Sequence, residues 1–446
     1  MDSTLGFGKQ WTVLCTLVVL ALVFSACAVP TTPTAPVEDT GAEVGGECTT
    51  VKYMVAAGSP FSVAVLKRLP EFEEQSGIKV EVIELPYEQT LPKSILEAKN
   101  QSGAYDVVQI NRPSLAALAE PGLLLPLEDF ISQELIDDLF PVHRDYATFG
   151  GKLYAVPHSN DIRALYYRTD LFAAAGLEKA PNTWDEMVAA AEALNAPDKG
   201  VYGLLMAGSP KGPGVWVLSD FIYQAGGSIL DDAGTVVLDS PEAKRGLQFM
   251  TDLVAEYKVA PSGTADYMWG DTRNNFAQGR GAMVIEFNDI IPLLEAPDSA
   301  VKGNYDLALL PGDVRRGTNN AGWLLGIPTG AKNLACAGQL IEWIMSPEIQ
   351  AHMSRESGTL SGRASVIDML IAEGEEGLPT GDVNGKARWE FYKQVIDTTY
   401  ELPRTSLEPQ IEDAMAQAVT AALSGAQAPD AALDEAAAKV REIMGQ

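Results

Sequence analysis

The side chains that most often carry out catalysis are sparse or poorly spaced in this chain. Its three histidines, His143, His158 and His352, lie far apart and lack the spacing of metal ligands. A Ser-x-x-Lys match at 299–302 has no accompanying Lys-Thr-Gly, and the chain has no Gly-x-Ser-x-Gly elbow and no phosphate-binding glycine loop. The sequence therefore predicts no metal, no cofactor and no catalytic residue. One enzymatic alternative stays open, a carboxylate pair that hydrolyses glycosides, because 60 acidic residues make some pair inevitable.

The first 27 residues of the chain suggest export and lipid attachment. An apolar run over residues 11–24 is too short to span a bilayer as a helix but suits a signal peptide. It ends in Ser25-Ala26-Cys27, which resembles the lipobox in which the cysteine becomes the acylated first residue of a bacterial lipoprotein. Phe24 stands where leucine is usual, so ordinary secretion and an uncleaved anchor remain alternatives. We expect a signal peptide over residues 1–26 and a lipidated Cys27.

The segment 27–49 connects this signal to the rest of the chain. It is rich in proline, threonine and small residues and lacks the large apolar side chains that a core needs, which predicts a flexible tether near a membrane, outside the cytoplasm. Cys48 and Cys336 are then an even pair in a compartment where thiols oxidise. They form either a disulfide or two unrelated small core residues, because the sequence does not reveal the distance between their Cα atoms.

The body that follows is long and acidic. About 400 residues remain, enough for two or three domains, and 46% of the chain is hydrophobic, as in globular proteins. The net charge of −28 argues against nucleic acid and anionic lipid as partners, because phosphate binding needs clustered lysine and arginine. A polar but uncharged ligand fits this charge better.

The early body alternates strand-like and helix-like segments. Strands are expected at 51–56, 78–85 and 106–110, with helices between them at 60–76 and 87–100. This order predicts an α/β fold with a parallel sheet. Ligands of such sheets bind beyond the carboxyl ends of the strands, which is where Ser59 and Asn111 stand.

The later body continues the alternation. Strands are expected at 164–167, 282–287 and 324–327, and helices at 169–175, 216–225, 240–257, 270–278 and 331–345. Thr183 and Glu186 have the spacing of a capping box at the start of another helix. The Ala-rich tail from about 406 to 444 is expected to form two helices divided by Pro429.

Phrases spread over residues 50–446 resemble the extracellular solute-binding proteins of bacterial ABC importers, family 1, the sugar-binding type. They are GGKLYAVP at 150–157, ALYYRTDLFAAAGL at 164–177, PNTWDEM at 181–187, FAQGRGAMVI at 276–285, AGWLLGIPTGAKN at 321–333, SPEIQ at 346–350 and SGRASV at 361–366. Any one phrase is weak, but their order and spacing extend over nearly the whole body.

The resemblance implies a two-lobed, periplasmic-binding-protein-like α/β fold (type II). Each lobe would be a mostly parallel sheet flanked by helices, with a hinge between the lobes and the ligand in the cleft. By analogy the first lobe takes 50–158 and 323–365, and the second takes 159–318 and 370–446.

The resemblance also implies a function. The chain would be a monomer, not an enzyme, that captures a mono- or oligosaccharide and delivers it to ABC permease subunits in the membrane. Glycerol phosphate or another small polar solute remains an alternative, for which Arg363 and Arg112 are the residues to watch. A sensor that passes closure to a signalling partner is a third possibility.

A sugar site needs carboxylates and amides for the hydroxyls and aromatic rings for the C–H faces. The expected ligand-binding residues are Ser59, Asn111, Asp161, Trp216, Trp269, Asn288, Asp289, Trp323 and Arg363. Asp161, Trp216 and Trp323 match family positions that contact ligand, and Arg363 matches a frequent basic one. Many sugar binders carry a Gly-x-Trp phrase near Asn288, and its absence here predicts a more polar site that is less suited to a stacked disaccharide.

Overall fold

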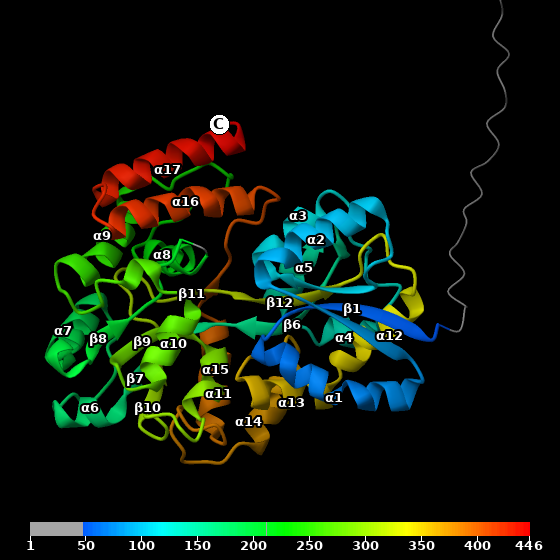
Figure 1. The fold of residues 1–446 in the computed structure, drawn as a ribbon, viewed down its shortest axis with the longest axis horizontal. Helices are drawn as coiled ribbons and strands as arrows, with labels where there is room; N and C mark the ends of the chain where they lie inside the picture. The colour runs from blue at the N-terminus through cyan, green and yellow to red at the C-terminus, as the bar shows by residue number, and fades with distance from the viewer. Residues whose placement is uncertain (1–47, 211) are drawn as a thin grey trace, which may run out of the picture. The chain divides into compact units, whose positions relative to one another are not determined.

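The computed structural model describes residues 48–446 apart from residue 211. The predicted signal peptide, the lipidation site at Cys27 and most of the predicted tether lie outside the described residues. Within them, two main β-sheets flanked by helices organise the body (Figure 1). No helix in the described part of the chain has both the length and the apolar character needed to cross a bilayer.

The first sheet contains strands from the beginning and from the later part of the chain. Its order is β2 (Lys79–Leu85), β1 (Thr50–Ala56), β3 (Val107–Asn111), β12 (Ala321–Gly326) and β6 (Val156–Asp161). β1 pairs in parallel with β2 and β3, whereas β12 runs antiparallel between β3 and β6. The helices that pack on this sheet are α1 (Pro60–Ser76), α2 (Tyr87–Asn100), α5 (Pro141–Ala147) and α12 (Leu334–Ile344), and α13 (Pro347–Ser357) packs on α1.

The second sheet is less parallel than predicted. Its order is β10 (Tyr305–Ala308), β7 (Arg163–Arg168), β9 (Gly281–Phe287) and β8 (Tyr202–Leu205). β8 and β9 are parallel, but β7 is antiparallel to both of its neighbours. The expectation of a mostly parallel sheet is wrong here, because β7 enters directly from the first sheet and pairs antiparallel with both β10 and β9.

Helices cover both faces of this second sheet. They are α6 (Thr169–Ala174), α7 (Trp184–Leu194), α8 (Pro213–Gln224), α9 (Pro241–Ala255), α10 (Trp269–Ala277), α14 (Ala364–Glu373), α15 (Lys386–Ile396), α16 (Glu408–Leu423) and α17 (Pro429–Met444). Alternation along β7 explains two separate cores, because Leu165 packs into one while Ala164 and Tyr166 pack into the other. The first sheet has a core of its own.

Short elements fill the connections. They are η1 (Arg112–Ser114), α3 (Leu115–Ala119), α4 (Gln133–Asp137), β4 (Thr148–Phe149), β5 (Lys152–Leu153), η2 (Pro197–Lys199), η3 (Thr264–Asp266), η4 (Asn288–Ile290), α11 (Ile291–Leu294), β11 (Thr318–Asn319) and β13 (Thr399–Tyr400). The chain passes from the first sheet to the second between Asp161 and Arg163, and it returns between β11 and β12. The lobe boundaries at 158, 323 and 365 stay predictions.

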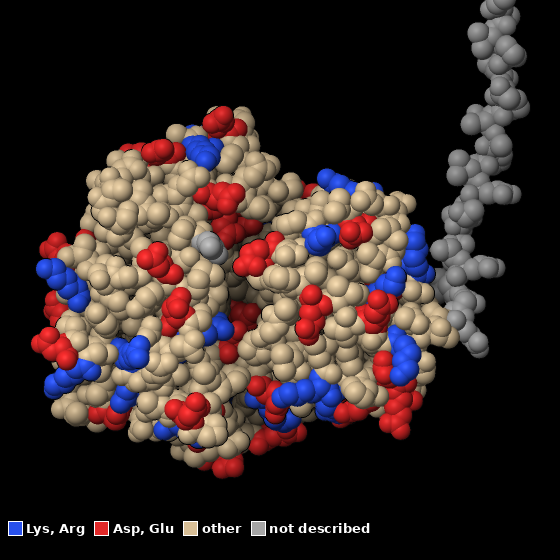
Figure 2. All heavy atoms as spheres, in the orientation of Figure 1, with Lys and Arg blue, Asp and Glu red and all other residues tan. Residues whose placement is uncertain are grey.

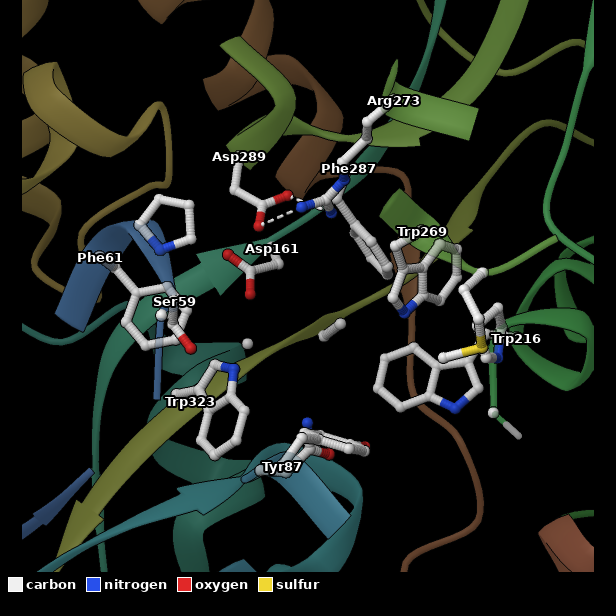
Figure 3. A pocket seen from close by; sticks show the side chains of 18 of the residues that line it. Ser59, Phe61, Tyr87, Asp161, Trp216, Trp269, Arg273, Phe287, Asp289 and Trp323 are labelled. Atoms are coloured by element: carbon white, nitrogen blue, oxygen red, sulfur yellow. Dashed lines mark hydrogen bonds and ion pairs between the residues drawn. The ribbon is translucent and has the colours of Figure 1, made fainter. Parts of the chain in front are cut away.

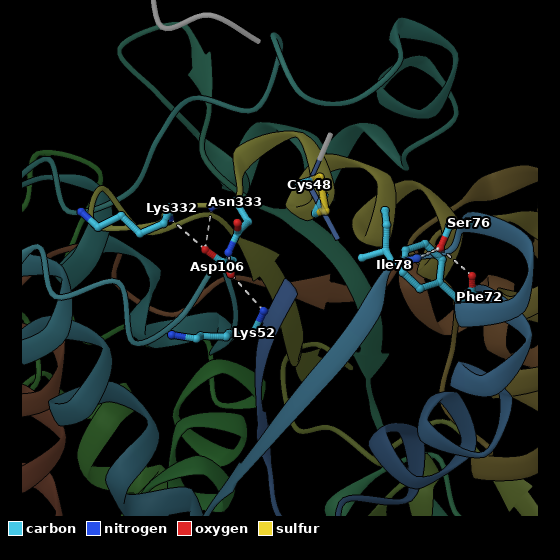
Figure 4. The surroundings of a disulfide bond; sticks show 9 residues. Cys48, Lys52, Phe72, Ser76, Ile78, Asp106, Lys332 and Asn333 are labelled. Carbon is cyan, nitrogen blue, oxygen red and sulfur yellow. Dashed lines mark hydrogen bonds between the residues drawn. A yellow bond between two sulfur atoms is a disulfide. The ribbon is translucent and has the colours of Figure 1, made fainter. Parts of the chain in front are cut away.

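A disulfide joins Cys48 to Cys336, with 5.9 Å between their Cα atoms (Figure 4). It connects the start of β1 to helix α12. Asp106 lies near this junction and accepts hydrogen bonds from the backbone nitrogens of Lys52, Lys332 and Asn333 at 2.8–3.0 Å. The beginning of the body is therefore held to the segment before α12 both covalently and by a buried carboxylate.

His158 lies in a buried polar cluster of the first sheet. Its ring packs edge-on against Phe61, with 5.5 Å between the centroids, and Gln109 Nε2 lies 3.4 Å from His158 Nε2. Burial lowers the pKa of His158 to about 3. A histidine in the unfolded chain takes up its proton near pH 6.5, so between these values the unfolded chain binds more protons than the folded one. Acid therefore destabilises the fold through this residue.

Replacing His158 with glutamine is expected to remove this pH dependence. Relative to the variant, the wild-type chain should lose about 2 kcal/mol of unfolding free energy between about pH 6.5 and about pH 5, because each pH unit contributes about 1.4 kcal/mol. Urea unfolding at both pH values measures the difference. Stability curves that stay parallel for the two chains would contradict the lowered pKa.

Candidate functional site

A cavity of about 290 Å³ lies where the ends of the two sheets face each other (Figure 3). Seven of the nine predicted ligand-binding residues line it. They are Ser59, Asn111, Asp161, Trp216, Trp269, Asp289 and Trp323. They come from segments as far apart in the chain as the start of α1 and strand β12, so the fold assembles this cavity from both sheets.

Four helices of nine or more residues begin at the cavity. The lining residues at their starts are Ser59 before α1, Tyr87 in α2, Gly212 before α8 and Met268 before α10. Strands of α/β sheets lead into helices at their carboxyl ends, which explains this convergence. Unpaired backbone N–H groups and the positive ends of the helix dipoles thus surround the cavity.

Aromatic rings form two opposing walls. On the side of the first sheet, Trp323 contacts Phe61 and Tyr87, with centroids 5.8 Å apart in each pair. On the side of the second sheet, Phe287 contacts Trp216 at 6.0 Å and Trp269 at 5.0 Å. Figure 3 shows the two groups on opposite sides of the open space.

The expectation of a more polar site is therefore wrong. Phe287 supplies a ring near Asn288 even though the Gly-x-Trp phrase is absent, because it is the last residue of β9 and its ring turns into the cavity. Sequence reasoning also missed Phe61, Tyr87 and Arg273. The signal for Tyr87 was its place directly after the 78–85 strand, at the same sheet edge as Ser59.

Carboxylates and one guanidinium line the end of the cavity near β6 and β9. Arg273 holds Asp289 with two bonds, Nη1 to Oδ2 at 3.0 Å and Nη2 to Oδ1 at 2.6 Å. Its Nη2 also lies 3.3 Å from Oε1 of the buried Glu286. Glu286 further accepts hydrogen bonds from the Thr272 hydroxyl at 2.7 Å and from the Phe287 nitrogen at 2.9 Å.

Asp161 differs from these carboxylates because its Oδ1 is buried and has no hydrogen-bond partner among the described residues. Burial raises the pKa of the Asp161 carboxyl well above its usual range, and the charge of Asp289 adds to this while Arg273 opposes it. Figure 3 shows the carboxyl group facing the open space, apart from the Arg273–Asp289 pair. Asp161 is thus available to accept hydrogen bonds from a ligand.

Trp216 is fixed on both its ring and its backbone. The indole Nε1 donates to Glu412 Oε1 of helix α16 at 3.2 Å. The backbone oxygen accepts hydrogen bonds from Arg163 Nη2 at 2.9 Å and from Asn319 Nδ2 at 3.3 Å. Burial raises the pKa of Glu412, and the bond from Trp216 opposes this rise. These bonds hold the Trp216 ring at the cavity before any ligand arrives.

Two predicted site residues, Asn288 and Arg363, do not line the cavity. Asn288 is buried beside the crossing between the sheets, where it accepts from the Ile162 nitrogen at 3.3 Å and donates to the Asn160 oxygen at 3.2 Å. Arg363 Nε donates to Asp138 Oδ2 at 2.5 Å. The structure thus does not bring these two side chains to the cavity, because both join distant parts of the chain instead.

Arg112, the other residue considered for an anion, is also occupied. It is buried and paired with Glu401, with 2.6 Å between Nη2 and Oε1, and its guanidinium lies 4.1 Å from the centroid of the Tyr146 ring. The lining of the cavity that the structure describes therefore contains one cation, Arg273, and that cation is already paired.

Comparisons with known proteins agree with this geometry. The family model of the bacterial extracellular solute-binding proteins matches residues 52–351. A probable ABC transporter-binding protein of Deinococcus radiodurans is 24% identical over 390 residues, which cover 84% of this chain and 88% of that protein.

Two solved structures are similar in fold. Maltose-bound MalE3 of T. maritima has a TM-score of 0.80 and 26% identity, covering 89% of this chain and 100% of that one. An ABC transporter solute-binding protein of Thermotoga lettingae bound with α-D-tagatose has a TM-score of 0.79 and 28% identity, with coverage of 89% and 100%. These matches confirm the predicted α/β fold of two-lobed periplasmic binding proteins.

Proposed function

Because this chain belongs to the bacterial extracellular solute-binding proteins, we propose that it captures an uncharged saccharide or sugar alcohol in the cavity and delivers it to the permease of an ABC importer. One observation carries the proposal, the two opposing aromatic walls with the unpaired Asp161 between them. Rings stack on the C–H faces of a sugar, and a free carboxylate oxygen accepts from its hydroxyls. The relatives support this, since the two similar structures hold maltose and tagatose.

The size of the cavity favours a small ligand. At about 290 Å³ it lies at the lower end of ordinary ligand pockets, which run from about 300 to 1,000 Å³. A ligand of one sugar ring, or a linear sugar alcohol of similar size, fits that space with both walls in contact. Of the two saccharide classes, monosaccharides and oligosaccharides, we therefore favour the monosaccharides.

The charges at the cavity disfavour the anionic alternative. A glycerol phosphate would need an unpaired cation, and Arg273, Arg112 and Arg363 are each held by carboxylates. The helix starts supply positive potential, but Asp161 and Asp289 already lie within it. A phosphate placed there would meet like charges at short range.

The two walls suggest how binding leads to transport. Trp323 belongs to the first sheet and Trp216 to a helix of the second sheet, so a ligand contacts both lobes fully only when they are closed. Ligand binding then stabilises the closed state by its differential affinity, and the permease recognises that state. A sensor that passes the same closure to a signalling partner remains the alternative.

We place the protein outside the cytoplasm, held to the membrane by a lipid on Cys27 and acting as a monomer. Family membership supports the extracytoplasmic location, and the Cys48–Cys336 disulfide suits an oxidising compartment. Labelling of the full chain with a fatty-acid analogue in a bacterial host, compared with Cys27→Ala, tests the anchor. Equal labelling of the two chains would reject it.

Thermal unfolding against a ligand panel tests the function. Monosaccharides, sugar alcohols, maltose, sugar acids, glycerol phosphates and polyamines are each added to the protein, and the stabilising compound is recovered and identified by mass spectrometry. A ligand at 100 times its dissociation constant adds about 2.7 kcal/mol of stability. Stabilisation by an uncharged saccharide recovered intact supports the proposal. A cleaved saccharide would favour the carbohydrate-active enzyme, and stabilisation by phosphates alone would reject the sugar ligand.

Replacing Trp323 with alanine is expected to weaken binding of the stabilising saccharide by about 30-fold or more, because a central aromatic contact contributes about 2 kcal/mol. Trp323→Phe should keep most of the affinity. Trp343→Phe is the matched control, since Trp343 packs against Phe72 outside the cavity. Titration calorimetry measures the three dissociation constants, and an unchanged value for Trp323→Ala would contradict the role of this wall.

A further inference from the structure

Three carboxyl groups lie at or beside one end of the cavity, with a single cation among them. Asp161, Glu286 and Asp289 are each buried or nearly so, and Arg273 is the guanidinium among them. Arg273 reaches Asp289 with two short bonds and Glu286 with a longer one. The structure gives no bond from Arg273 to Asp161, although the charge of Arg273 acts on that carboxyl. The Arg273 guanidinium is therefore paired with the two carboxylates from β9 and η4.

The positions of both carboxylates that pair with Arg273 are fixed by the surrounding structure. Glu286 is held by the Thr272 hydroxyl of helix α10, the helix that also carries Arg273, so the guanidinium and the carboxylate keep a fixed relation. Asp289 lies in η4, directly beyond the end of β9. A planar guanidinium holding a carboxylate by two parallel bonds has one favoured orientation, which lysine does not reproduce. Figure 3 shows the pair at the edge of the cavity with Asp161 below it.

Resting on the proposed function, we propose that Arg273 is a positioning residue that sets the charge selectivity of the cavity. By holding Asp289 and Glu286, it leaves Asp161 as the free acceptor and leaves no cation free for the ligand. The ligand group that reaches this end must then donate hydrogen bonds, as a pair of sugar hydroxyls does. A sugar acid would bring a further negative charge to an end of the cavity where three carboxyl groups already surround a single cation, and its binding would be weakened.

Replacing Asp289 tests this selectivity directly. Asp289→Asn removes one negative charge and releases the guanidinium from its strongest partner, so Arg273 becomes available to a ligand carboxylate. The probes are D-glucose with D-glucuronate, D-mannitol with D-mannonate, and maltitol with maltobionate. Each pair has an uncharged and an acidic member of nearly the same shape. Titration calorimetry gives the affinity ratio within each pair for wild-type protein and variant.

The expected wild-type ratio favours the uncharged member of the bound pair by about 100-fold or more, as two like charges at short range would produce. In Asp289→Asn this ratio should fall by at least about 10-fold, with much of the change coming from tighter binding of the acid. A wild-type ratio near one, or a ratio that Asp289→Asn leaves unchanged, would overturn the inference.

Replacing Arg273 gives an independent readout. Arg273→Gln should weaken binding of the uncharged probe by about 10-fold or more, because Asp289 and Glu286 then lose the cation that holds them, and Arg273→Lys should restore only part of the affinity. Arg168→Gln is the matched control, since Arg168 pairs with Asp170 away from the cavity. Full rescue by lysine would overturn the geometric role, and circular dichroism establishes that each variant is folded.

These outcomes separate the inference from the proposed function. If wild-type protein binds none of the uncharged probes, and none of the other sugars in the thermal panel, the proposed function fails. If it binds an uncharged probe while the ratio does not respond to Asp289→Asn, the function stands and the role of Arg273 fails.

Discussion

Replacing Arg163 with methionine is expected to lower the free energy of unfolding by about 3–5 kcal/mol, because it leaves a buried carboxylate without its cation. Arg163 and Asp220 are both buried, with side chains 0% and 2% exposed, and Arg163 Nε donates to Asp220 Oδ2 at 2.7 Å. Burial raises the pKa of Asp220, and the charge of Arg163 is the main influence that opposes this rise. Methionine fills much of the same volume but supplies neither charge nor donor.

The pair matters because Asp220 joins several segments. Its carboxylate also accepts from the Asn319 nitrogen at 2.8 Å and from the Tyr400 hydroxyl at 3.1 Å. These partners lie in β11 and β13, beside the point where the chain returns to the first sheet. Arg163 in turn bonds the backbone oxygen of Trp216 in the cavity wall. Loss of the pair should therefore loosen the crossing between the sheets as well as the ligand site.

The pH dependence of the loss distinguishes an uncompensated charge from a packing defect. In the Arg163→Met variant the folded-state pKa of Asp220 should rise further, so the folded chain holds a proton that the unfolded chain releases above about pH 4. The destabilisation should then be larger at about pH 8 than at about pH 5. Urea unfolding of wild type and variant at both pH values measures it.

Two further variants serve as controls for this prediction. Arg163→Met combined with Asp220→Asn should recover part of the stability, because the buried charge is gone. Arg168→Met lies on the same strand but breaks a partly exposed pair with Asp170, so it should cost less than about 1 kcal/mol. Equal losses in Arg163→Met and Arg168→Met would reject the importance of the buried pair.

Local features of the fold could be predicted from the sequence, and the reasons are physical. The helix predicted over 60–76 agrees with α1, because Pro60 favours the first turn and Gly77 adopts the left-handed conformation that ends it. The start of α7 was predicted from Thr183, whose hydroxyl accepts from the Glu186 nitrogen. The reciprocal bond of a capping box differs, since Glu186 bonds the Asn182 nitrogen instead. The Asn182 nitrogen, one residue earlier in the chain than Thr183, takes the place of the expected donor.

Pairing between distant segments could not be predicted in the same way. The position of β12 between β3 and β6 depends on contacts with residues more than 150 positions away, which leave no local pattern. Arg363 matched a basic family position, yet its partner Asp138 lies 225 residues earlier. An arginine that binds a ligand and one that joins two segments look alike in sequence.

The candidate site was predictable where strand ends determine it. Ser59, Asn111 and Trp323 were expected at the cavity because they stand at sheet edges or at a crossing of the chain. Phe287 and Arg273 were missed because their orientation depends on how β9 and α10 pack. Their roles at the site stay proposals until the ligand is identified.

Removing the disulfide is expected to lower the free energy of unfolding by about 3–5 kcal/mol. Cys48 and Cys336 are 288 positions apart, so their bond restricts a very long loop of the unfolded chain. The double variant Cys48→Ser and Cys336→Ser leaves no unpaired thiol in the part of the chain that the structure describes. Urea unfolding with and without dithiothreitol measures the effect. The reductant should lower the free energy of unfolding of the wild type to that of the variant, and it should leave the free energy of unfolding of the variant unchanged.

The surroundings of the disulfide predict which properties survive its loss. Asp106 still holds the segment before α12 through the nitrogens of Lys332 and Asn333, and Lys52 still ties β1 to the same carboxylate (Figure 4). The double variant should therefore fold and bind its ligand with unchanged affinity, because neither cysteine lines the cavity. Weaker ligand binding by the folded double variant would show instead that the disulfide shapes the site. An unchanged unfolding midpoint would show that the long loop is already restricted in the unfolded chain.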